Sequence, residues 1–451
     1  MGYNGQLSPE AFDVKARALR PFYFIVVVWG ERFTDYLVNF CIASLLSPNN
    51  IPALRNSGNK FLIAATDEDW ARLQPHPLFR LLKQYIEPVF IRIPPCPEGE
   101  NKYVHMGLGH KLATEMAFRD HAYGAILTAD LVFSDGTIAA LQRHAVNGVE
   151  VVLTAALRFG EEPFCDQLKQ RGFRIGAENG PLVLTGRELV AVGIRSFHPE
   201  TLSFGWESHA IWHFPSAVWW HVPREDGVLV HSLSWAPLLM DYGAIKRHDS
   251  SAIDNWTIDG DYVHGNFGLQ GKVHVVRDSD EMMLVSFGPM AEGGISNEKS
   301  KAQSTLKKGK ILFDTYHHPM MDLLKRKAFS VPVYWHSRDI NAGWEAVRKK
   351  AERVVTNTTH PSAIRIWLFR ELPQRVLDGR QKCRDFARRI GEVGSRMMGL
   401  VNYAKSALRY YWGTRHHAWE LFRRAMSGDP AARTRIKQSL KVFANHFRKI
   451  V

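Results

Sequence analysis

Between residues 21 and 290, short runs of apolar residues alternate with stretches in which apolar residues recur every three or four positions. The runs are rich in Val, Ile and Phe and end at turn-forming residues, which predicts buried strands at 22–28, 60–65, 88–93, 125–128 and 149–154. The wider spacing predicts helices at 31–46, 106–121 and 135–146. This alternation favours an α/β fold with a mostly parallel sheet flanked by helices.

The pattern changes after residue 290. Residues 291–310 are rich in Gly, Ser and Lys and predict a linker or mobile loop. Residues 311–451 have a mainly helical pattern. We therefore expect an N-terminal extension at 1–20, an α/β domain at 21–290, the linker, and a basic helical C-terminal region at 311–451.

The net charge of +13 is concentrated in residues 375–451, which hold 18 Lys and Arg against 5 Asp and Glu. Basic amphipathic helices can bind an anionic membrane surface or nucleic acid, or can simply face solvent. Residues 410–412 (Tyr-Tyr-Trp) permit nucleic-acid binding but do not require it, so we regard nucleic acid as the less favoured partner. The four cysteines include no CxxC pair and predict neither a zinc site nor a disulfide framework.

The first part of the chain contains no pattern for export. The first twenty residues carry charges of both signs without an apolar core, and the apolar run at 22–29 is too short to cross a bilayer. We expect a cytoplasmic protein. Residues 375–451 add the hypothesis of peripheral attachment to the inner face of the membrane.

Two carboxylates, Asp130 and Asp135, follow the strand predicted at 125–128. A carboxylate at the carboxyl end of a buried strand lies where open α/β sheets bind their ligands. There it can hold a divalent cation such as Mg²⁺ or Mn²⁺ against a phosphate group. This placement points to a nucleotide-type substrate.

The order of these elements resembles the glycosyltransferase A fold of the nucleotide-diphospho-sugar transferases over roughly residues 21–290. In that family the first strand ends over the nucleotide, an acidic residue after the second strand receives the base, and an Asp-x-Asp motif holds a metal on the diphosphate. The resemblance assigns donor binding to Trp29, Gly30, Asp67, Thr128 and Asp130. Thr128 replaces the first aspartate of the motif.

The resemblance also assigns residues outside these strands. The helix before the acidic motif has its amino end near the diphosphate, which implies donor contacts for His110 and Lys111, with Gly107 and Gly109 allowing close approach of the backbone. His264 resembles a late histidine that completes metal or diphosphate contacts, so the implied metal ligands are Asp130, Asp135 and His264.

Residues 254–265 form a second candidate site, for the acceptor. Strand alternation would place Asp259 and Asp261 on one face, where they could act as acceptor ligand and general base, although a turn is the alternative. Asp241 could take the place of Asp261 as base. Trp235 is the preferred residue for stacking on a sugar.

The resemblance implies a glycosyltransferase that moves a sugar from a nucleotide-diphosphate donor to a hydroxyl acceptor, such as a glycan or a lipid-linked sugar. One alternative is a nucleotidyltransferase, although the sequence after the first strand offers only Gly30 and Arg32 of the glycine-rich basic loop expected there. Another is a binding or scaffold protein that keeps the fold and has lost turnover. The residues themselves do not identify the sugar or the acceptor.

Overall fold

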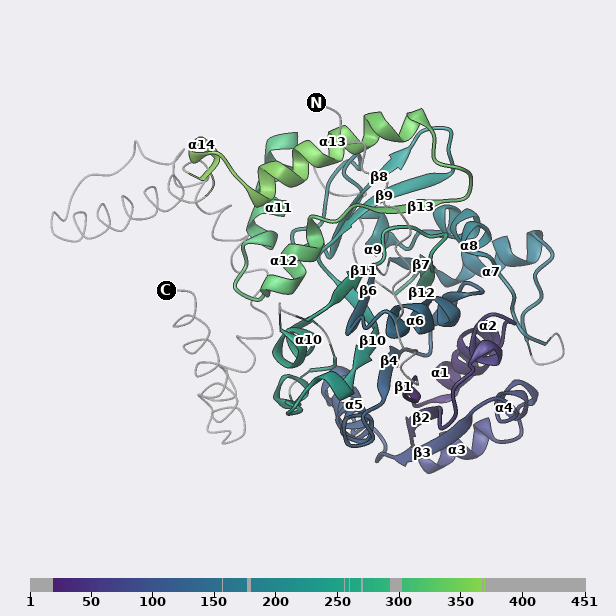
Figure 1. Ribbon diagram of the computed structural model, residues 1–451. Coiled ribbons are helices and arrows are strands. Elements are labelled where there is room, and N and C mark those ends of the chain that lie inside the picture. Colours follow the sequence, from purple (N-terminus) through teal and green to yellow (C-terminus); the bar gives the residue numbers. More distant parts are fainter. Residues whose placement is uncertain are drawn as a thin grey trace, which may run out of the picture. The chain divides into compact units, whose positions relative to one another are not determined.

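A computed structural model of the chain describes residues 19–366 and 369, apart from 156, 177–179, 255, 259, 269–270 and 293–301. Its centre is a seven-stranded sheet in the order β11-β6-β10-β4-β1-β2-β3 (Figure 1). The strands are β1 (Phe22–Val27), β2 (Lys60–Ala65), β3 (Glu87–Arg92), β4 (Tyr123–Leu127), β6 (Val151–Ala155), β10 (Trp235–Asp241) and β11 (Val273–Val275). Only β10 runs antiparallel to its neighbours. The predicted α/β fold with a mostly parallel sheet is confirmed.

Helices flank this sheet. Their bounds are α1 (Glu31–Tyr36), α2 (Ala43–Leu45), α3 (Asp67–Leu73), α4 (Pro77–Leu82), α5 (Lys102–Arg119), α6 (Thr137–Val146), α7 (Glu161–Gln170), α8 (Gly186–Gly193), α9 (Pro199–Leu202) and α10 (Gly260–Phe267). A π-helical stretch, η1 (Leu37–Ile42), joins α1 to α2, and a 3₁₀ turn, η6 (Ser251–Ile253), packs beside α5. Every residue of β1 is buried, as expected for a strand covered on both faces.

Two smaller sheets complete the strands. One has the order β5-β12-β7, with β5 (Leu131–Phe133), β12 (Leu284–Gly288) and β7 (Arg158–Gly160). The other has the order β13-β9-β8, with β13 (Val333–His336), β9 (Gly227–Ser232) and β8 (Ala217–Val222). The second of these carries its own apolar core, in which Trp206 and Trp220 are buried. These two tryptophans are therefore core residues.

The first compact unit extends to Pro361. It includes α11 (Thr305–Tyr316), α12 (Leu323–Phe329) and α13 (Ala342–Thr359), which the sequence placed in a separate C-terminal region, and α11 begins inside the stretch expected as a linker. Of the second unit, Ser362–Val451, the structure describes residues 362–366, which include α14 (Ala363–Ile366), and residue 369. The basic segment 375–451 lies outside the described residues, so its expected membrane contact stays a prediction. Within the described part, no helix has the length and apolarity needed to span a membrane.

Candidate functional site

The chain changes direction across the sheet between β1 and β4. After β1 it builds β2 and β3 on one side, then returns to pair β4 with the other side of β1. In an open α/β sheet such a switch point opens a crevice outside the carboxyl ends of the two strands, where ligands bind. Trp29 and Gly30 follow β1 at this edge, and Thr128 and Asp130 follow β4. The fold therefore brings four of the predicted donor-binding residues to one edge of the sheet.

Asp130 is the carboxylate at this edge. Asp130 is partly buried, and the loss of water around its carboxyl group raises its pKa. A hydrogen bond with Thr128 and the positive charges of Arg158 and Lys102 act in the opposite direction. A desolvated carboxylate close to cationic groups is suited to binding a cation or the hydroxyl groups of a ligand.

Gly30 turns the chain sharply after β1. Its φ of 82° lies in the left-handed region that favours glycine, and its amide donates a hydrogen bond of 3.1 Å to Oδ1 of Asp69. Asp69 is buried and also accepts a hydrogen bond from Thr66. Asp67, the acidic residue predicted to receive the base, is exposed and pairs with Arg92 at 2.9 Å. The buried carboxylate after β2 is thus Asp69, and it fixes the turn at Gly30.

Helix α5 starts earlier than the sequence predicted. It begins at Lys102 and is capped by Asn101, so His110 and Lys111 lie in its third turn and not at its amino end. His110 is buried, its Nδ1 lies 2.9 Å from the hydroxyl of Thr257, and burial lowers its pKa to about 4. Lys111 pairs with Asp254 at 2.6 Å. Lys102, the first residue of α5, is close enough for its charge to lower the pKa of Asp130.

Gly107 and Gly109 serve helix packing. A Cβ on Gly109 would meet Ala64 and Val27 at 2.7–2.9 Å, so the helix lies directly against β1 and β2 there. A Cβ on Gly107 would come within 2.4–2.6 Å of backbone oxygens of residues 253 and 256. The close approach at these two glycines is to the protein's own strands and loop, and an approach to a diphosphate stays a prediction.

A cavity of about 440 Å³ lies beside this edge, between the loop after β3, the first turns of α5 and η6. His105 lines it and packs edge-on against Trp29, with ring centroids 5.1 Å apart. Lys111 and Asp254 line the same cavity. The cavity thus begins next to the end of β1 and continues along α5.

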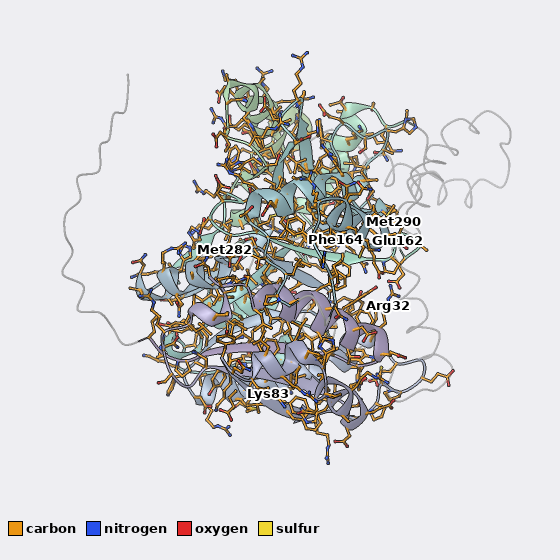
Figure 2. All side chains as sticks on the ribbon, turned by 90° about the vertical axis from the view of Figure 1, so that its right-hand side faces the viewer. Arg32, Lys83, Glu162, Phe164, Met282 and Met290 are labelled. Carbon is orange, nitrogen blue, oxygen red and sulfur yellow. The ribbon has the colours of Figure 1, made fainter. Side chains whose placement is uncertain are left out.

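A second cavity, of about 540 Å³, is lined by Arg32 and by residues that the sequence did not single out. Arg32, in the first turn of α1, faces Glu161 of α7 and pairs with Glu292 at 2.8 Å. The hydroxyl of Tyr36 donates to Glu161, and burial followed by this contact raises the pKa of Tyr36. Figure 2 shows Arg32 on the same side of the molecule as Glu162. The available sequence signal was a set of charged residues directly after β1 and β7.

Asp135 is held at a distance from Asp130. Strand β5 lies between them, and both carboxylate oxygens of Asp135 accept hydrogen bonds from Asn49, at 2.8 and 2.7 Å. The helix α6 that was expected to begin at Asp135 is instead preceded by Gly136, which adopts φ of 92°. Asp135 therefore fastens the end of β5 to the loop after α2.

The predicted acceptor residues Trp235 and Asp241 lie at opposite edges of the sheet. Because β10 is antiparallel, Trp235 pairs with Ala155 at the carboxyl edge, whereas Asp241 pairs with Tyr123 at the opposite edge. Trp235 is 8 % exposed, and Asp241 is engaged by Arg20 and by the amide of Gly243.

The segment read as a strand around Asp261 is helical. Asp261 lies in the first turn of α10, exposed and 3.9 Å from Lys325, and His264 lies in the last turn of the same helix. Strand alternation therefore does not apply to Asp261. Asp259 lies outside the described residues.

Among the described residues, three clusters combine side chains able to hold a metal ion. They are Cys96, Glu100 and His105; His144, His274 and Glu281; and Asp278, Asp280 and His336. None includes the expected ligands Asp130, Asp135 and His264, which lie on three different elements. Within the described residues these three side chains do not come together, and a metal ion at Asp130 stays a prediction.

The cluster around Glu281 gives a stability prediction. Oε1 of Glu281 lies 2.6 Å from Nε2 of His144 and 2.7 Å from Nε2 of His274. Burial by itself raises the pKa of Glu281, but the two histidines outweigh it and lower the pKa to about 2. The ionised carboxylate therefore stabilises the fold above about pH 4.5, and this contribution is lost as the pH falls towards 2.

We expect Glu281→Gln to lower the free energy of unfolding at pH 7 by on the order of 1–3 kcal/mol, measured by urea denaturation. The difference from the wild type should shrink below pH 4.5. The control Glu68→Gln, at a side chain that is 83 % exposed, should change stability by less than about 0.5 kcal/mol. An effect of Glu281→Gln that is independent of pH would contradict this assignment.

Comparison with known proteins adds little to this geometry. The chain matches no protein-family model and no curated protein. Among solved structures it is similar to a chain described as a glucose-1-phosphate thymidylyltransferase from Bacillus anthracis in complex with sucrose. The identity is 10 %, the TM-score is 0.21, and the match covers 32 % of this chain and 57 % of that chain. A similarity this low carries no functional argument, so the proposal below depends on the residues at the sheet edge.

Proposed function

We propose that the protein is a transferase that uses a nucleotide-diphosphate sugar and binds this donor at the carboxyl ends of β1 and β4. The observation that carries the proposal is the position of Asp130, a partly buried carboxylate in the turn after the buried strand β4, at the switch point of the sheet. Ligand sites of open α/β sheets form at such points. The resemblance to the glycosyltransferase A fold, in which this position contacts the donor, adds to the same conclusion.

The surroundings of Asp130 suit a diphosphate group. Lys102 and Arg158 contribute positive charge, as their effect on the pKa of Asp130 indicates. Lys102 also begins the eighteen-residue helix α5, whose amino end favours anions. When the sugar leaves the donor, negative charge develops on the diphosphate, and fixed positive groups lower the barrier by stabilising it.

Asp130 is acidic, unlike Lys102 and Arg158, and therefore has a different role in donor binding. We assign it to the donor's hydroxyl groups or to a cation that arrives together with the diphosphate, since Mg²⁺ is often held by one carboxylate and substrate phosphates. No step of the proposed reaction is assigned to a metal ion, because the three expected ligands do not meet. The hydroxyl acceptor would approach from the same edge.

A thermal-shift screen tests this proposal. Full-length protein is heated with UDP, GDP, CDP, ADP and their common sugar conjugates, each with and without Mg²⁺ or Mn²⁺. A ligand present at 100 times its dissociation constant should add about 2.7 kcal/mol of stability. We expect stabilisation by one nucleotide family, followed by transfer or slow hydrolysis of the matching sugar conjugate.

The outcomes separate the alternatives. Stabilisation only in the presence of the metal would assign Asp130 to a shared cation. Binding without any turnover would favour a scaffold protein that has kept the donor site. If no nucleotide shifts the melting temperature, the donor site proposed here does not exist.

A further inference from the structure

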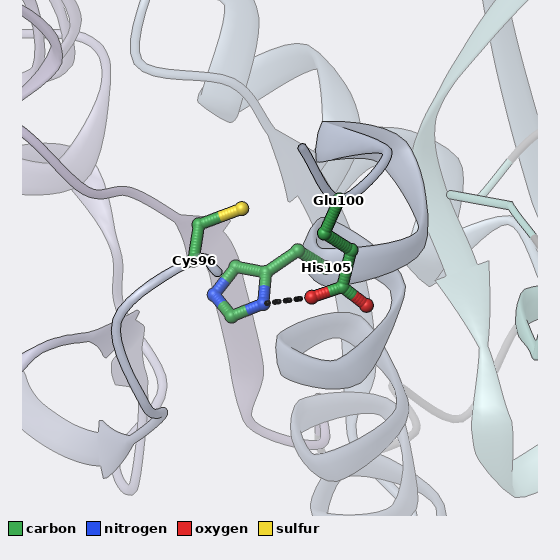
Figure 3. Close-up of side chains that lie close together, drawn as sticks. All are labelled: Cys96, Glu100 and His105. Carbon is green, nitrogen blue, oxygen red and sulfur yellow. Dashed lines mark ion pairs between the residues drawn. The ribbon is translucent and has the colours of Figure 1, made fainter. Parts of the chain in front are cut away.

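The loop between β3 and α5 brings together three side chains with metal-binding chemistry. Cys96 and Glu100 lie in this loop, and His105 lies in the first turns of α5. One donor atom of each residue lies within 4.8 Å of the donor atoms of the other two. Figure 3 shows the imidazole between the other two side chains, with one nitrogen turned towards Glu100.

The side chains of His105 and Glu100 are not hydrogen-bonded to each other. Nδ1 of His105 is 3.9 Å from Oε2 of Glu100, which is too long for a hydrogen bond. The His105 side chain is only 3 % exposed, and its Nε2 has no hydrogen-bond partner among the described residues. The nitrogen placed to share a ligand with Glu100 is Nδ1, which faces that carboxylate, and Nε2 is the other nitrogen of the ring.

The spacing suits a tetrahedral cation. With Zn–N and Zn–O bonds of about 2.1 Å, the two donor atoms of a tetrahedral site are about 3.4 Å apart. The pair His105–Glu100, at 3.9 Å, would have to close by about 0.5 Å, a movement within the reach of side-chain rotation. Thiolate, imidazole and carboxylate together favour Zn²⁺ over Mg²⁺ or Ca²⁺, which prefer oxygen ligands.

We propose that Cys96, Glu100 and His105 bind a zinc ion whose fourth position faces the 440 Å³ cavity. All three of its predicted ligands belong to a different segment from Asp130, so the inference goes beyond the donor site and does not depend on it. Glu100 and His105 line the cavity, and three protein ligands with one open position are typical of zinc sites that bind water or a substrate oxygen.

The surrounding structure limits the motion of the ligands. Pro94, Pro95 and Pro97 restrict the backbone around Cys96. The indole of Trp29 packs edge-on against the ring of His105 and holds it in place. The amide of Glu100 donates to the carbonyl of Pro97 at 3.1 Å, which closes a turn between the first two ligands. The site is therefore largely formed before the ion binds.

Cobalt substitution tests the proposal without reference to any enzyme activity. Full-length protein is treated with a chelator and titrated with Co²⁺, which gives a near-ultraviolet charge-transfer band when a thiolate binds it. We expect one equivalent of Co²⁺ to produce this band and Zn²⁺ to displace it. Cys96→Ser should abolish the band, and Glu100→Gln should weaken zinc binding by more than about 100-fold, because even outer partners of metal ligands contribute 10–100-fold.

Cys165→Ser is the matched control, since Cys165 is another partly buried cysteine and lies in α7, outside the cluster. It should leave the band unchanged. In parallel, Zn²⁺ should protect Cys96 but not Cys165 from alkylation, as read by peptide mass spectrometry. The absence of a thiolate band in the wild type, or a band that survives in Cys96→Ser, would overturn the proposal. Neither result would alter the nucleotide screen, so the two hypotheses fail separately.

Discussion

Asp130→Asn is expected to abolish the stabilisation by the nucleotide donor and to slow sugar transfer by about 10²–10³-fold, the cost of removing one electrostatic group from a catalytic site. The same change should not lower the stability of the free protein. Burial raises the pKa of Asp130, so ionising this carboxyl group costs more free energy in the folded chain than in the unfolded chain. The neutral amide removes that penalty and still offers an oxygen to the hydroxyl of Thr128.

The sign of the effect follows from the raised pKa. In the unfolded chain Asp130 ionises at its ordinary pKa of 3.8, whereas in the folded chain it ionises at a higher pH. The free energy of unfolding therefore falls as the pH rises from 3.8 through the folded pKa. The stability gained by Asp130→Asn should therefore be larger at pH 7 than near pH 4, measured by urea denaturation. Asp339→Asn, at an exposed side chain, is the control for donor binding. Donor binding that survives in Asp130→Asn would remove the basis of the proposed function.

Gly107→Ala is expected to destabilise the protein by about 1–3 kcal/mol, the usual cost of overpacking. Its Cβ would lie 2.4 Å and 2.6 Å from backbone oxygens of Trp256 and Ile253, and backbone atoms cannot rotate away. The change would separate α5 from the loop around η6. Urea denaturation would measure the loss.

Gly265→Ala is the matched control in α10, because a Cβ at Gly265 meets nothing within 4 Å. It should be neutral or stabilising by up to about 1 kcal/mol, as for glycine replaced by alanine in a helix. If Gly107 instead admitted a phosphate, Gly107→Ala would leave stability unchanged and weaken only ligand binding. Unchanged stability in Gly107→Ala would therefore contradict the packing assignment.

The sheet could be predicted from the sequence because its strands are short, apolar and separated by helical spacing. Five expected strands correspond to β1, β2, β3, β4 and β6. The positions of Trp29 and Asp130 followed from the same pattern, since both come directly after a buried strand. The part of the candidate site at the ends of β1 and β4 could therefore be predicted from local periodicity.

Other site residues depended on tertiary structure that local patterns do not contain. Asp241 was expected near the acceptor, but the antiparallel direction of β10 carries it to the opposite edge. Asp67 and Asp69 both lie in the first turn of α3, and only the contact with Gly30 decides which of them is buried. The spacing of Asp261 suggested a strand, whereas the residue lies in α10.

The cysteine pattern does not exclude the zinc site proposed above. Without a CxxC pair, the sequence predicts no zinc site. The proposed site uses a single cysteine, and its other two ligands, Glu100 and His105, belong to residue types that are common on any surface. Only the packing of the loop against α5 and Trp29 distinguishes Glu100 and His105 from the other glutamates and histidines of the chain.

The antiparallel strand β10 has a wider consequence. Since β6 ends and β10 begins side by side, at Ala155 and Trp235, residues 156–234 leave the sheet and return to it at the edge that carries Asp130. This excursion, which contains β7, β8 and β9, can change in length and sequence without altering the order of the sheet. Arg158, in the first strand of this excursion, acts on the pKa of Asp130, so β7 is the part of the excursion that the proposed donor site would hold constant.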